Sequence, residues 1–362
     1  MTLRSVSRLG LSVAAAVPIP VVSRQLLRNR GVIFMLHRFR DPDRRVVGHD
    51  PEHLRRSLAY LRRHGYEVVA LDELLRRLVD GEARGAIAFT IDDGYLDQAT
   101  VAAPVFAEFG CPVTTFVTTG FLDGTMWFWW DRVAFAFAQT TARAFSGRIA
   151  EDEVLYGWRD AAERQQAADD FVARCKTVPD DEKERAIAEL ASETCVSLPA
   201  TPPPEYAPMS WEDLRRCERR GMSFAPHTVT HPVLARVGEG RSAWEIAESW
   251  RRLQTEAAAP LPIFCYPNGQ PGDFGSREYR AIADAGMVGA VIGAPGYAGG
   301  WPVTGVADGR FQLRRFALPD DVPTMAQYVS GLERLPVPLA CGVNSVFRGP
   351  GSAGHKHNIS AV

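Results

Sequence analysis

The chain has 362 residues, of which 46% are hydrophobic and 23% are charged. This composition is typical of an ordinary globular protein with one large domain or two smaller ones. The formal net charge of −2 gives no reason to expect nucleic acid as a partner.

The first thirty residues form a separate N-terminal segment. They begin MTLRSVSRLGLSVAAAVPIPVV, with early arginines and a short apolar run like those of a signal peptide. Pro18 and Pro20 interrupt that run, which is also too short to span a bilayer. Six dispersed cysteines without C-x-x-C spacing argue against a cysteine zinc site and favour a reducing compartment. We therefore expect a cytoplasmic protein, with an exported or periplasmic one as the alternative.

Strand-like apolar runs then alternate with helix-like amphipathic segments, which predicts an α/β barrel or a doubly wound sheet. Several of the runs are apolar on both faces, as in strands that are covered on both sides. The expected strands are residues 31–36, 66–71, 86–91, 112–117, 222–225, 262–266, 287–293 and 312–318. The expected helices are residues 51–65, 71–81, 98–110, 211–221 and 276–286.

Residues 123–205 break this alternation, since they contain no convincing strand. We expect a mostly helical insertion between two parts of one domain, residues 31–122 and 206–335. The aromatic run Trp127–Trp130 is expected to pack in the core of the insertion, with a sugar-stacking wall as the alternative. A flexible tail is expected over residues 336–362.

Two adjacent carboxylates follow a buried strand in the segment IAFTIDDGYLD. Asp92 and Asp93 repel each other, and each resists ionisation when it is removed from water. A nearby cation would compensate them. The alternative is an ordinary Asp-Gly turn at Gly94.

Two imidazoles lie four residues apart in the segment FAPHTVTHPVL. His227 and His231 would share one face of a helix, or converge in a tight turn, and this pair suits a borderline cation such as zinc. Two structural histidines near a helix start are the alternative reading of this segment.

Two weaker signals also follow predicted strands. His37 ends the run GVIFML, and the turn Pro267-Asn268-Gly269 follows the run IFCY. Each alone is more often structural. However, active sites of α/β barrels lie at the carboxyl ends of the strands, where these two signals and the two polar pairs would meet. Together they predict a metal-dependent active site.

These motifs resemble those of polysaccharide deacetylases with a NodB-homology domain, of the carbohydrate esterase family 4 type. FTIDDGY resembles the family motif T-F-D-D-G-Y with Ile91 in place of Phe, and HTVTHP matches H-[ST]-x-x-H-P in full. FCYPNG resembles the P-[YF]-G motif. The resemblance spans about residues 31–121 and 206–318. It implies a distorted (β/α)7 TIM-like barrel, interrupted here by the insertion.

The resemblance also implies roles for the site residues. Asp93, His227 and His231 would bind a divalent metal, with zinc as the expected ion, and Asp92 would be the general base. The backbone N–H of Asn268 would contribute to an oxyanion hole.

The chain departs from the family pattern in its general acid, because residues 260–340 contain no histidine. The segment MLHRF resembles relatives that carry this histidine on an N-terminal strand, so His37 is the candidate acid. The arginine before the proline motif and the late D-x-x-D-W motif are also absent. Arg38, Arg314 and Arg315 are the candidates to steady Asp92 instead.

The expected activity is hydrolysis of N-acetyl groups on aminosugars of a polysaccharide or its precursor. This makes the chain a carbohydrate deacetylase that acts on C–N bonds of linear amides, with an N-acetylated glycan as its partner. An O-acetyl esterase or a deformylase on a related glycan would use the same site. The missing arginine and late motif leave a third reading, a catalytically silent sugar-binding protein.

Overall fold

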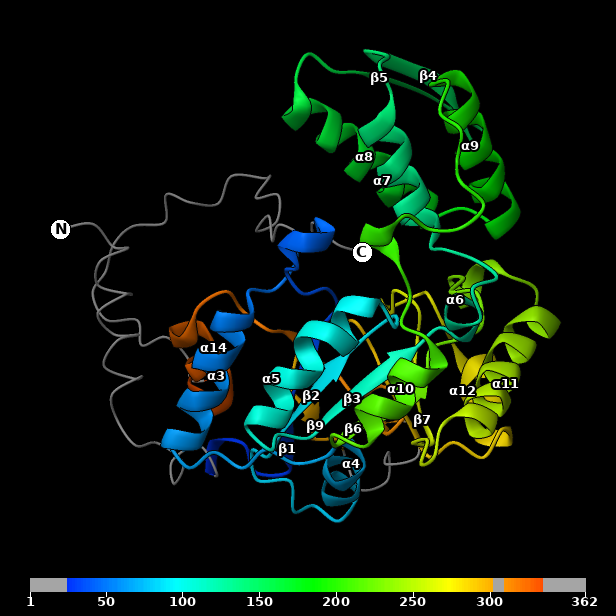
Figure 1. Ribbon diagram of the computed structural model, residues 1–362. Coiled ribbons are helices and arrows are strands. Elements are labelled where there is room, and N and C mark those ends of the chain that lie inside the picture. Colours follow the sequence, from blue (N-terminus) through cyan, green and yellow to red (C-terminus); the bar gives the residue numbers. More distant parts are fainter. Residues whose placement is uncertain (1–24, 302–308, 335–362) are drawn as a thin grey trace, which may run out of the picture.

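The computed structural model describes residues 25–301 and 309–334, and its largest sheet has six strands (Figure 1). Its strands are β1 (Arg30–Leu36), β2 (Ile87–Ile91), β3 (Val113–Val117), β6 (Met222–Pro226), β9 (Ala298–Gly299) and β10 (Phe316–Ala317). The order is β10-β1-β2-β3-β6, and these pairs are all parallel, while β9 pairs antiparallel with β1. The carboxyl ends of five strands therefore meet at one edge.

The sequence of the central strands explains their position. Every residue of β2, IAFTI, and of β3, VTTFV, is buried, as expected where helices or loops cover both faces of a parallel sheet. The one polar side chain of β2, Thr90, donates its hydroxyl to the Phe34 carbonyl oxygen at 2.9 Å. The buried strands β2 and β3 thus fix the positions of the loops that follow Ile91 and Val117.

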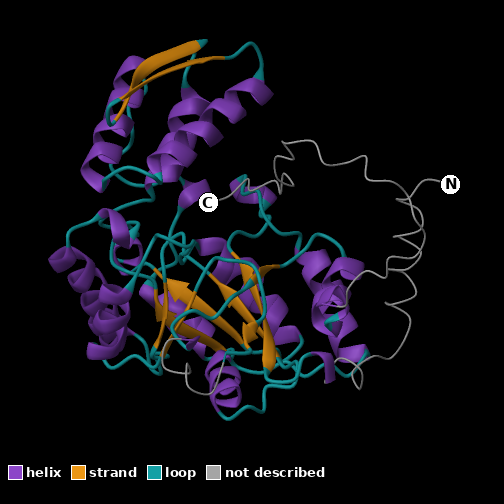
Figure 2. Cartoon of the chain, turned by 180° about the vertical axis from the view of Figure 1, so that it is seen from behind, coloured by secondary structure: helices purple, strands orange, loops and turns teal. Residues whose placement is uncertain are grey.

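Helices pack around this sheet (Figures 1 and 2). They are α3 (Pro51–Arg63), α4 (Leu71–Val79), α5 (Ala103–Glu108), α10 (Trp211–Glu218), α11 (Glu239–Glu256), α12 (Ser276–Asp284) and α14 (Val322–Ser330). The pair α3 and α14 lies at one side of the sheet, and the pair α11 and α12 at the other. No helix in the described ranges is both long and apolar enough to cross a membrane.

Three expected elements differ in the structure. Residues 66–71 form no strand, since Val68 makes only a single bridge with Ile87 before α4 begins. The expected strand 312–318 is reduced to β10 and a bridge from Leu313 to Val291. The expected helix 98–110 begins as a π-helical turn, because Pro104 cannot donate a backbone hydrogen bond.

The largest omission of the sequence prediction is α11. Its buried face carries Ser242, Glu245 and Ser249 among the apolar residues, which hides the helical periodicity. Helix α14 was also not predicted. The expected C-terminal tail and most of the expected N-terminal segment lie outside the described residues.

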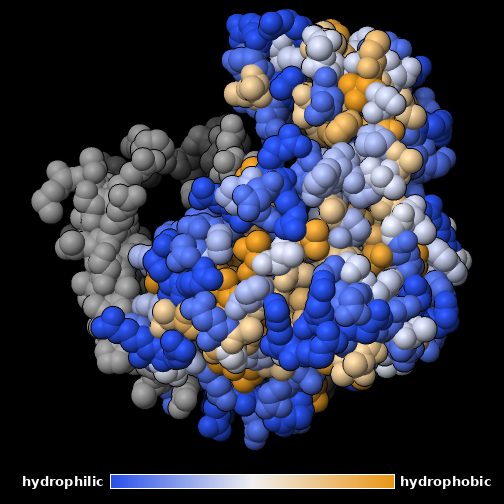
Figure 3. All heavy atoms as spheres, in the orientation of Figure 1, coloured by the Kyte–Doolittle hydropathy of each residue, from blue (hydrophilic) through white to orange (hydrophobic). Residues whose placement is uncertain are grey.

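The insertion forms a lobe above the sheet (Figures 1 and 3). Its elements are α7 (Trp129–Gln139), β4 (Ala144–Ile149), β5 (Asp152–Gly157), α8 (Ala161–Cys175) and α9 (Asp180–Glu193). The antiparallel hairpin β4–β5 corrects the expectation that this region lacks strands. One face of this hairpin is exposed, so its strands lack the continuous apolar run that marks the buried strands.

The aromatic run at the start of the insertion is buried, partly against residues outside the insertion. The side chains of Trp127, Phe128, Trp129 and Trp130 are all buried. Core packing, the favoured reading of this run, is therefore confirmed, and these rings do not form an exposed sugar-stacking wall.

The α/β class is confirmed. Strands β7 (Ile263–Cys265) and β8 (Gly289–Val291) form a separate parallel pair, and β4 and β5 form a third sheet. Within the described ranges, the hydrogen-bonded ladders therefore do not close into one continuous barrel.

Gly94, directly after the two carboxylates, is required by its surroundings. Its φ is 100°, and a Cβ atom there would lie 2.6 Å from Cδ1 of the buried Leu122. We expect Gly94→Ala to lower the free energy of unfolding by about 2–5 kcal/mol, through left-handed strain and overpacking. Chemical denaturation would measure this loss.

Gly124 provides the matched control. Its φ is also positive, at 69°, but no atom lies within 4 Å of the position of its Cβ. Gly124→Ala should therefore cost only about 1–2 kcal/mol. Equal losses for the two variants would contradict the packing argument.

Candidate active site

Polar side chains gather where three parallel strands end. His37 follows β1, Asp92 and Asp93 follow β2, and His227 follows β6. His231 lies in the loop after β6. Four of these five side chains are at least 95% buried, and His37 is 21% exposed. The structure thus brings together residues that are up to 194 positions apart in the chain, His37 and His231.

Three potential metal ligands converge in this group. Oδ1 of Asp93 lies 3.7 Å from Nε2 of His227 and 3.7 Å from Nε2 of His231. The two Nε2 atoms are 3.0 Å apart. Ligands that lie about 2.0–2.2 Å from one zinc ion are at most about 4.4 Å from each other. A single divalent ion could therefore contact all three side chains.

Left-handed backbone conformations aim these side chains at one point. Asp93 has a φ of 87° and Gly94 a φ of 100°, so the chain bends sharply where β2 ends. Thr228 and His231 have φ values of 64° and 58°. Non-glycine residues in this region store strain that the surrounding structure must offset, and they cluster at functional sites. The bend explains how two successive carboxylates both face the site.

Neighbouring groups fix the loop that carries the histidines. Nδ1 of His227 lies 2.8 Å from the carbonyl oxygen of Cys265 and donates to it, which leaves Nε2 free to bind a cation. Buried Glu245 of α11 accepts hydrogen bonds from the backbone N–H groups of Val229 and Thr230, at 2.8 and 2.9 Å. Glu245 is a functional residue that the sequence reading missed, together with its helix.

The electrostatics of this group fit a bound cation. Burial raises the pKa of Asp93 well above its usual range, and the charges of Asp92 and Asp131 raise it further. Burial also lowers the pKa of His227 and His231, which favours the neutral imidazoles that bind metals. Oδ2 of Asp93 is buried without a hydrogen-bond partner among the described residues. A cation would compensate this carboxylate, so the residues present fit a divalent metal.

Asp92 has the opposite environment from its neighbour. Nη1 and Nη2 of the buried Arg315 donate to its two carboxylate oxygens, each at 2.7 Å. Burial alone would raise the pKa of Asp92, but the charge and hydrogen bonds of Arg315 outweigh this and lower it to about 2. Asp92 is therefore ionised at pH 7, with one of its oxygens 3.8 Å from Nε2 of His37.

Of the three candidate arginines, only Arg315 contacts Asp92. Arg38 donates from Nε to Asp97 at 2.9 Å, and exposed Arg314 donates to the Pro295 carbonyl oxygen at 3.1 Å. Residues 311–315 alternate between the interior and the surface before β10 begins, which places Arg315 inside. The alternation was visible in the sequence, but the partner of the arginine was not.

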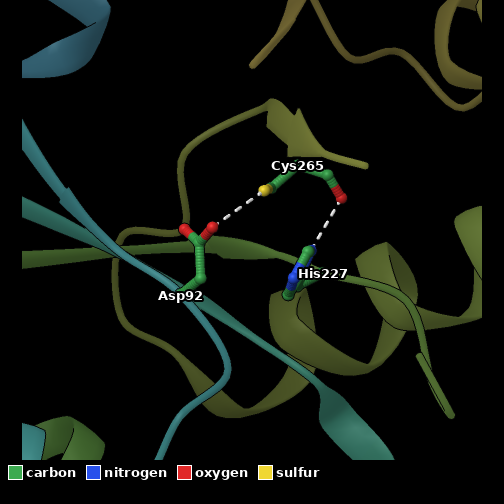
Figure 4. Close-up of side chains that lie close together, drawn as sticks. All are labelled: Asp92, His227 and Cys265. Atoms are coloured by element: carbon green, nitrogen blue, oxygen red, sulfur yellow. Dashed lines mark hydrogen bonds between the residues drawn. The ribbon is translucent and has the colours of Figure 1, made fainter. Parts of the chain in front are cut away.

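Cys265 completes a second close group with Asp92 and His227 (Figure 4). Its thiol is fully buried, and its Sγ lies 3.6 Å from Asp92 Oδ2. Burial raises the pKa of this thiol well above its usual range, whereas a metal ligand would be a thiolate. Arg315 already binds both oxygens of Asp92. This group is therefore a poorer metal site than the one at Asp93.

His37 lies on the more open side of Asp92. Burial lowers its pKa to about 4, although the charge of Asp92 opposes this shift. Gln98, a buried residue that the sequence reading missed, donates its Nε2 to the carbonyl oxygens of both His37 and Asp92. It begins the π-helical turn, a type of turn often found at functional sites. Gln98 thus fixes the ends of β1 and β2 to each other.

Asn268 lies in the loop after β7. Its φ is 59°, and its side chain donates to Asp273, which also accepts from the backbone N–H of Gln270 at 2.8 Å. The carbonyl oxygen of Cys265, the last residue of β7, contacts His227, so this loop starts beside the histidine pair.

Comparison with known proteins gives one family match. The sequence profile of the family described as polysaccharide deacetylase matches residues 186–288, which include His227, His231 and Asn268. No curated protein matches the chain.

Solved deacetylases share the fold. The deacetylase PplD of Streptococcus pyogenes, solved in complex with acetate, is 16% identical with a TM-score of 0.53, over 83% of this chain and 98% of that one. IcaB of Ammonifex degensii is 16% identical with a TM-score of 0.51, over 83% and 97%. A de-N-acetylase of Aggregatibacter actinomycetemcomitans is 13% identical with a TM-score of 0.50, over 83% and 99%.

These comparisons confirm the resemblance to polysaccharide deacetylases that the motifs predicted. At such low identities the solved structures establish the fold, and the family profile bears on the chemistry. Together they support the expected class of enzyme, a carbohydrate deacetylase among the hydrolases.

The pair of Asp92 and Arg315 should have a large and pH-dependent effect on stability. Its stabilisation is present above the unfolded pKa of Asp, about 3.9, and is lost as the pH falls through about 2. Arg315→Met should lower the free energy of unfolding by about 3–5 kcal/mol at pH 7, because it leaves a buried charge unpaired. At pH 4 the loss should be smaller, since the unpaired carboxyl group can take up a proton.

The matched control is Arg174→Met, which breaks the exposed pair of Arg174 and Asp170 on the insertion. Such pairs contribute only about 0–1 kcal/mol. Denaturant unfolding at both pH values would compare the variants. A loss for Arg315→Met that is the same at pH 4 and pH 7 would argue against an unpaired carboxylate as its cause.

Proposed function

We propose that the chain is a metal-dependent hydrolase that removes N-acetyl groups from aminosugars of a polysaccharide or its precursor. One observation carries this proposal: Asp93, His227 and His231 converge on one point, and a buried oxygen of Asp93 has no partner in the described part of the chain. Zinc is the divalent ion that suits two imidazoles and one carboxylate with open positions left for water and substrate.

A divalent cation, when bound, would supply Lewis-acid polarisation of the acetyl carbonyl and lower the pKa of a nearby water. The side chains would transfer the protons and orient the reacting groups. Asp92 remains ionised beside the site and would accept the proton of the attacking water. Arg315 holds both oxygens of Asp92 and thereby orients the carboxylate. This arrangement separates the carboxylate that binds the metal from the one that acts as base.

Two further groups would act on the tetrahedral intermediate. The backbone N–H of Asn268 would donate to the oxyanion, and one such donor contributes roughly 3 kcal/mol. His37 would donate a proton from Nε2 to the departing amine. Its low pKa makes the protonated form a strong acid, and Asp92, 3.8 Å away, would be the neighbour that supplies the proton.

The arrangement of the strands into a barrel is also part of this proposal. We propose that the strands form a distorted (β/α)7 TIM-like barrel. A hydrogen bond of 2.7 Å from the Leu261 N–H to the Phe224 carbonyl oxygen links β6 to the segment before β7. The bridge from Val291 to Leu313 links β8 to the segment before β10. These contacts support closure between the two parallel sheets.

Substitutions of Asp93 and of Asp92 should have different effects, because the first carboxylate would bind the metal and the second would act as the base. Asp93→Asn and His231→Ala should lose bound zinc and acetate release together. Asp92→Asn should keep stoichiometric zinc but slow turnover by about 10²–10⁴-fold. Metal analysis of the purified variants and acetate release would measure both. Near-normal turnover of Asp92→Asn would refute its role as the base.

His37→Ala should slow acetate release by about 10²–10⁴-fold with unchanged zinc content, because it removes only the proton donor. His64→Ala is the control, since His64 is the C-cap residue of α3 and its ring packs at a tilt against Tyr60. A His37 variant as fast as the unmodified enzyme would exclude this residue from the reaction.

The substrate can be tested with a panel of N-acetylated, O-acetylated and N-formylated aminosugar oligomers. A deacetylase should release acetate from the N-acetylated members at least as fast as from the O-acetylated ones. Faster release from O-acetylated members would indicate an esterase, and release of formate a deformylase. Glycan binding by a protein that contains no stoichiometric metal would indicate the silent sugar-binding protein.

A further inference from the structure

The insertion contributes side chains to the wall of the metal site. The ring of Trp130, in α7, lies edge-on to His231 with the ring centroids 4.6 Å apart. Phe128 contacts the same imidazole at 5.5 Å. The insertion therefore packs directly on one of the proposed metal ligands.

A buried carboxylate of α7 lies beside this contact. Asp131 is only 5% exposed, and its Oδ2 accepts a hydrogen bond of 2.7 Å from the Tyr95 hydroxyl. Nε1 of Trp130 donates to the same hydroxyl oxygen at 3.1 Å. Tyr95 is two residues from Asp93. Asp131 is thus connected to both sides of the metal site, to the carboxylate loop through Tyr95 and to His231 through Trp130.

Two of the buried carboxylates near this site are each bound by an arginine. Asp92 is bound by Arg315, and Asp97 is bound by Arg38 at 2.9 Å. Within the described ranges, Asp131 has no arginine bound to it, and only Tyr95 donates a hydrogen bond to its side chain. Among the described residues, no arginine or lysine donates a hydrogen bond to Asp93, and its Oδ2 has no hydrogen-bond partner.

Arg38 and Lys176 lie near Asp131 and Asp93 but form no ion pair with either carboxylate. Arg38 lies 3.8 Å from the centre of the Tyr95 ring, but its Nη2 donates to the Glu205 carbonyl oxygen at 2.6 Å. Lys176 of the insertion is partly exposed, and the charges of Asp273 and, to a smaller extent, Asp93 act to raise its pKa, against the larger effect of burial. Burial raises the pKa of Asp131 to about 7, although the charge of Arg38 opposes this shift. Burial therefore disfavours the negative charge on both Asp93 and Asp131, and a bound cation would favour it.

We propose that Asp131 is a positioning residue that stabilises the divalent cation electrostatically, so that the insertion supplies the second of two charges that the ion neutralises. Asp131 does not bind the metal directly. Its carboxylate, held by Tyr95, raises the affinity of the site formed by Asp93 and the two histidines. This inference rests on the proposed metal site. Outer-shell residues of metal sites typically change affinity by about 10–100-fold when they are replaced.

The test is zinc affinity of the purified full-length protein, measured by competition with a chromophoric chelator after removal of bound metal. Asp131→Asn removes the charge but keeps an oxygen that can accept the Tyr95 hydrogen bond. We expect its zinc affinity to fall by about 10–100-fold. Asp170→Asn makes the same change of charge at an exposed position of the insertion and should leave affinity unchanged.

Thermal unfolding distinguishes this role from a purely structural one. The metal-free Asp131→Asn protein should be at least as stable as the unmodified metal-free protein, because burial disfavours the charge that the substitution removes. The stabilisation by added zinc should shrink. A variant that is destabilised without metal yet binds zinc as tightly as before would show a structural role and overturn the proposal. Asp131→Ser provides a second neutral variant if the first does not fold.

The outcomes separate the two proposals. If the unmodified protein binds no zinc, the proposed metal site itself fails. If it binds zinc and both Asp131 variants bind with unchanged affinity, only the role of Asp131 fails.

Discussion

The structure depends on two adjacent buried carboxylates that have opposite electrostatic environments. Arg315 neutralises Asp92 with two hydrogen bonds of 2.7 Å, whereas Oδ2 of Asp93 has no hydrogen-bond partner among the described residues. Removing a charge from water costs several kcal/mol unless a partner compensates it. Arg315 therefore allows Asp92 to stay ionised. Asp93 has no bound arginine in the described ranges, and the proposed metal ion would compensate its charge instead.

The surrounding loops hold this arrangement in place. The left-handed conformations at Asp93 and His231 are unfavourable by themselves, and tertiary contacts offset their cost. Glu245 holds the histidine loop, and Gln98 ties the ends of β1 and β2 together. Because these supports are buried and hydrogen-bonded, the site is largely formed before any ligand binds.

The insertion is part of the site as well as an addition to the fold. The aromatic residues at its start, 127–130, are buried. Among them, Trp130 packs against His231, and the next residue, Asp131, accepts a hydrogen bond from Tyr95. A lobe inserted between β3 and β6 therefore contacts the side chains at the carboxyl ends of the strands. A sequence motif that lists only metal ligands and base omits this contribution.

The sequence alone determined the central strands, the α/β class and the residues that meet at the strand ends, because apolar runs and the pairs Asp92/Asp93 and His227/His231 are local patterns. Tertiary structure decided that Arg315, rather than Arg38 or Arg314, binds Asp92. It also decided that Glu245 and Asp131 lie beside the site. These contacts join residues from about 15 to more than 200 positions apart, and no local spacing encodes which buried charge will find which partner.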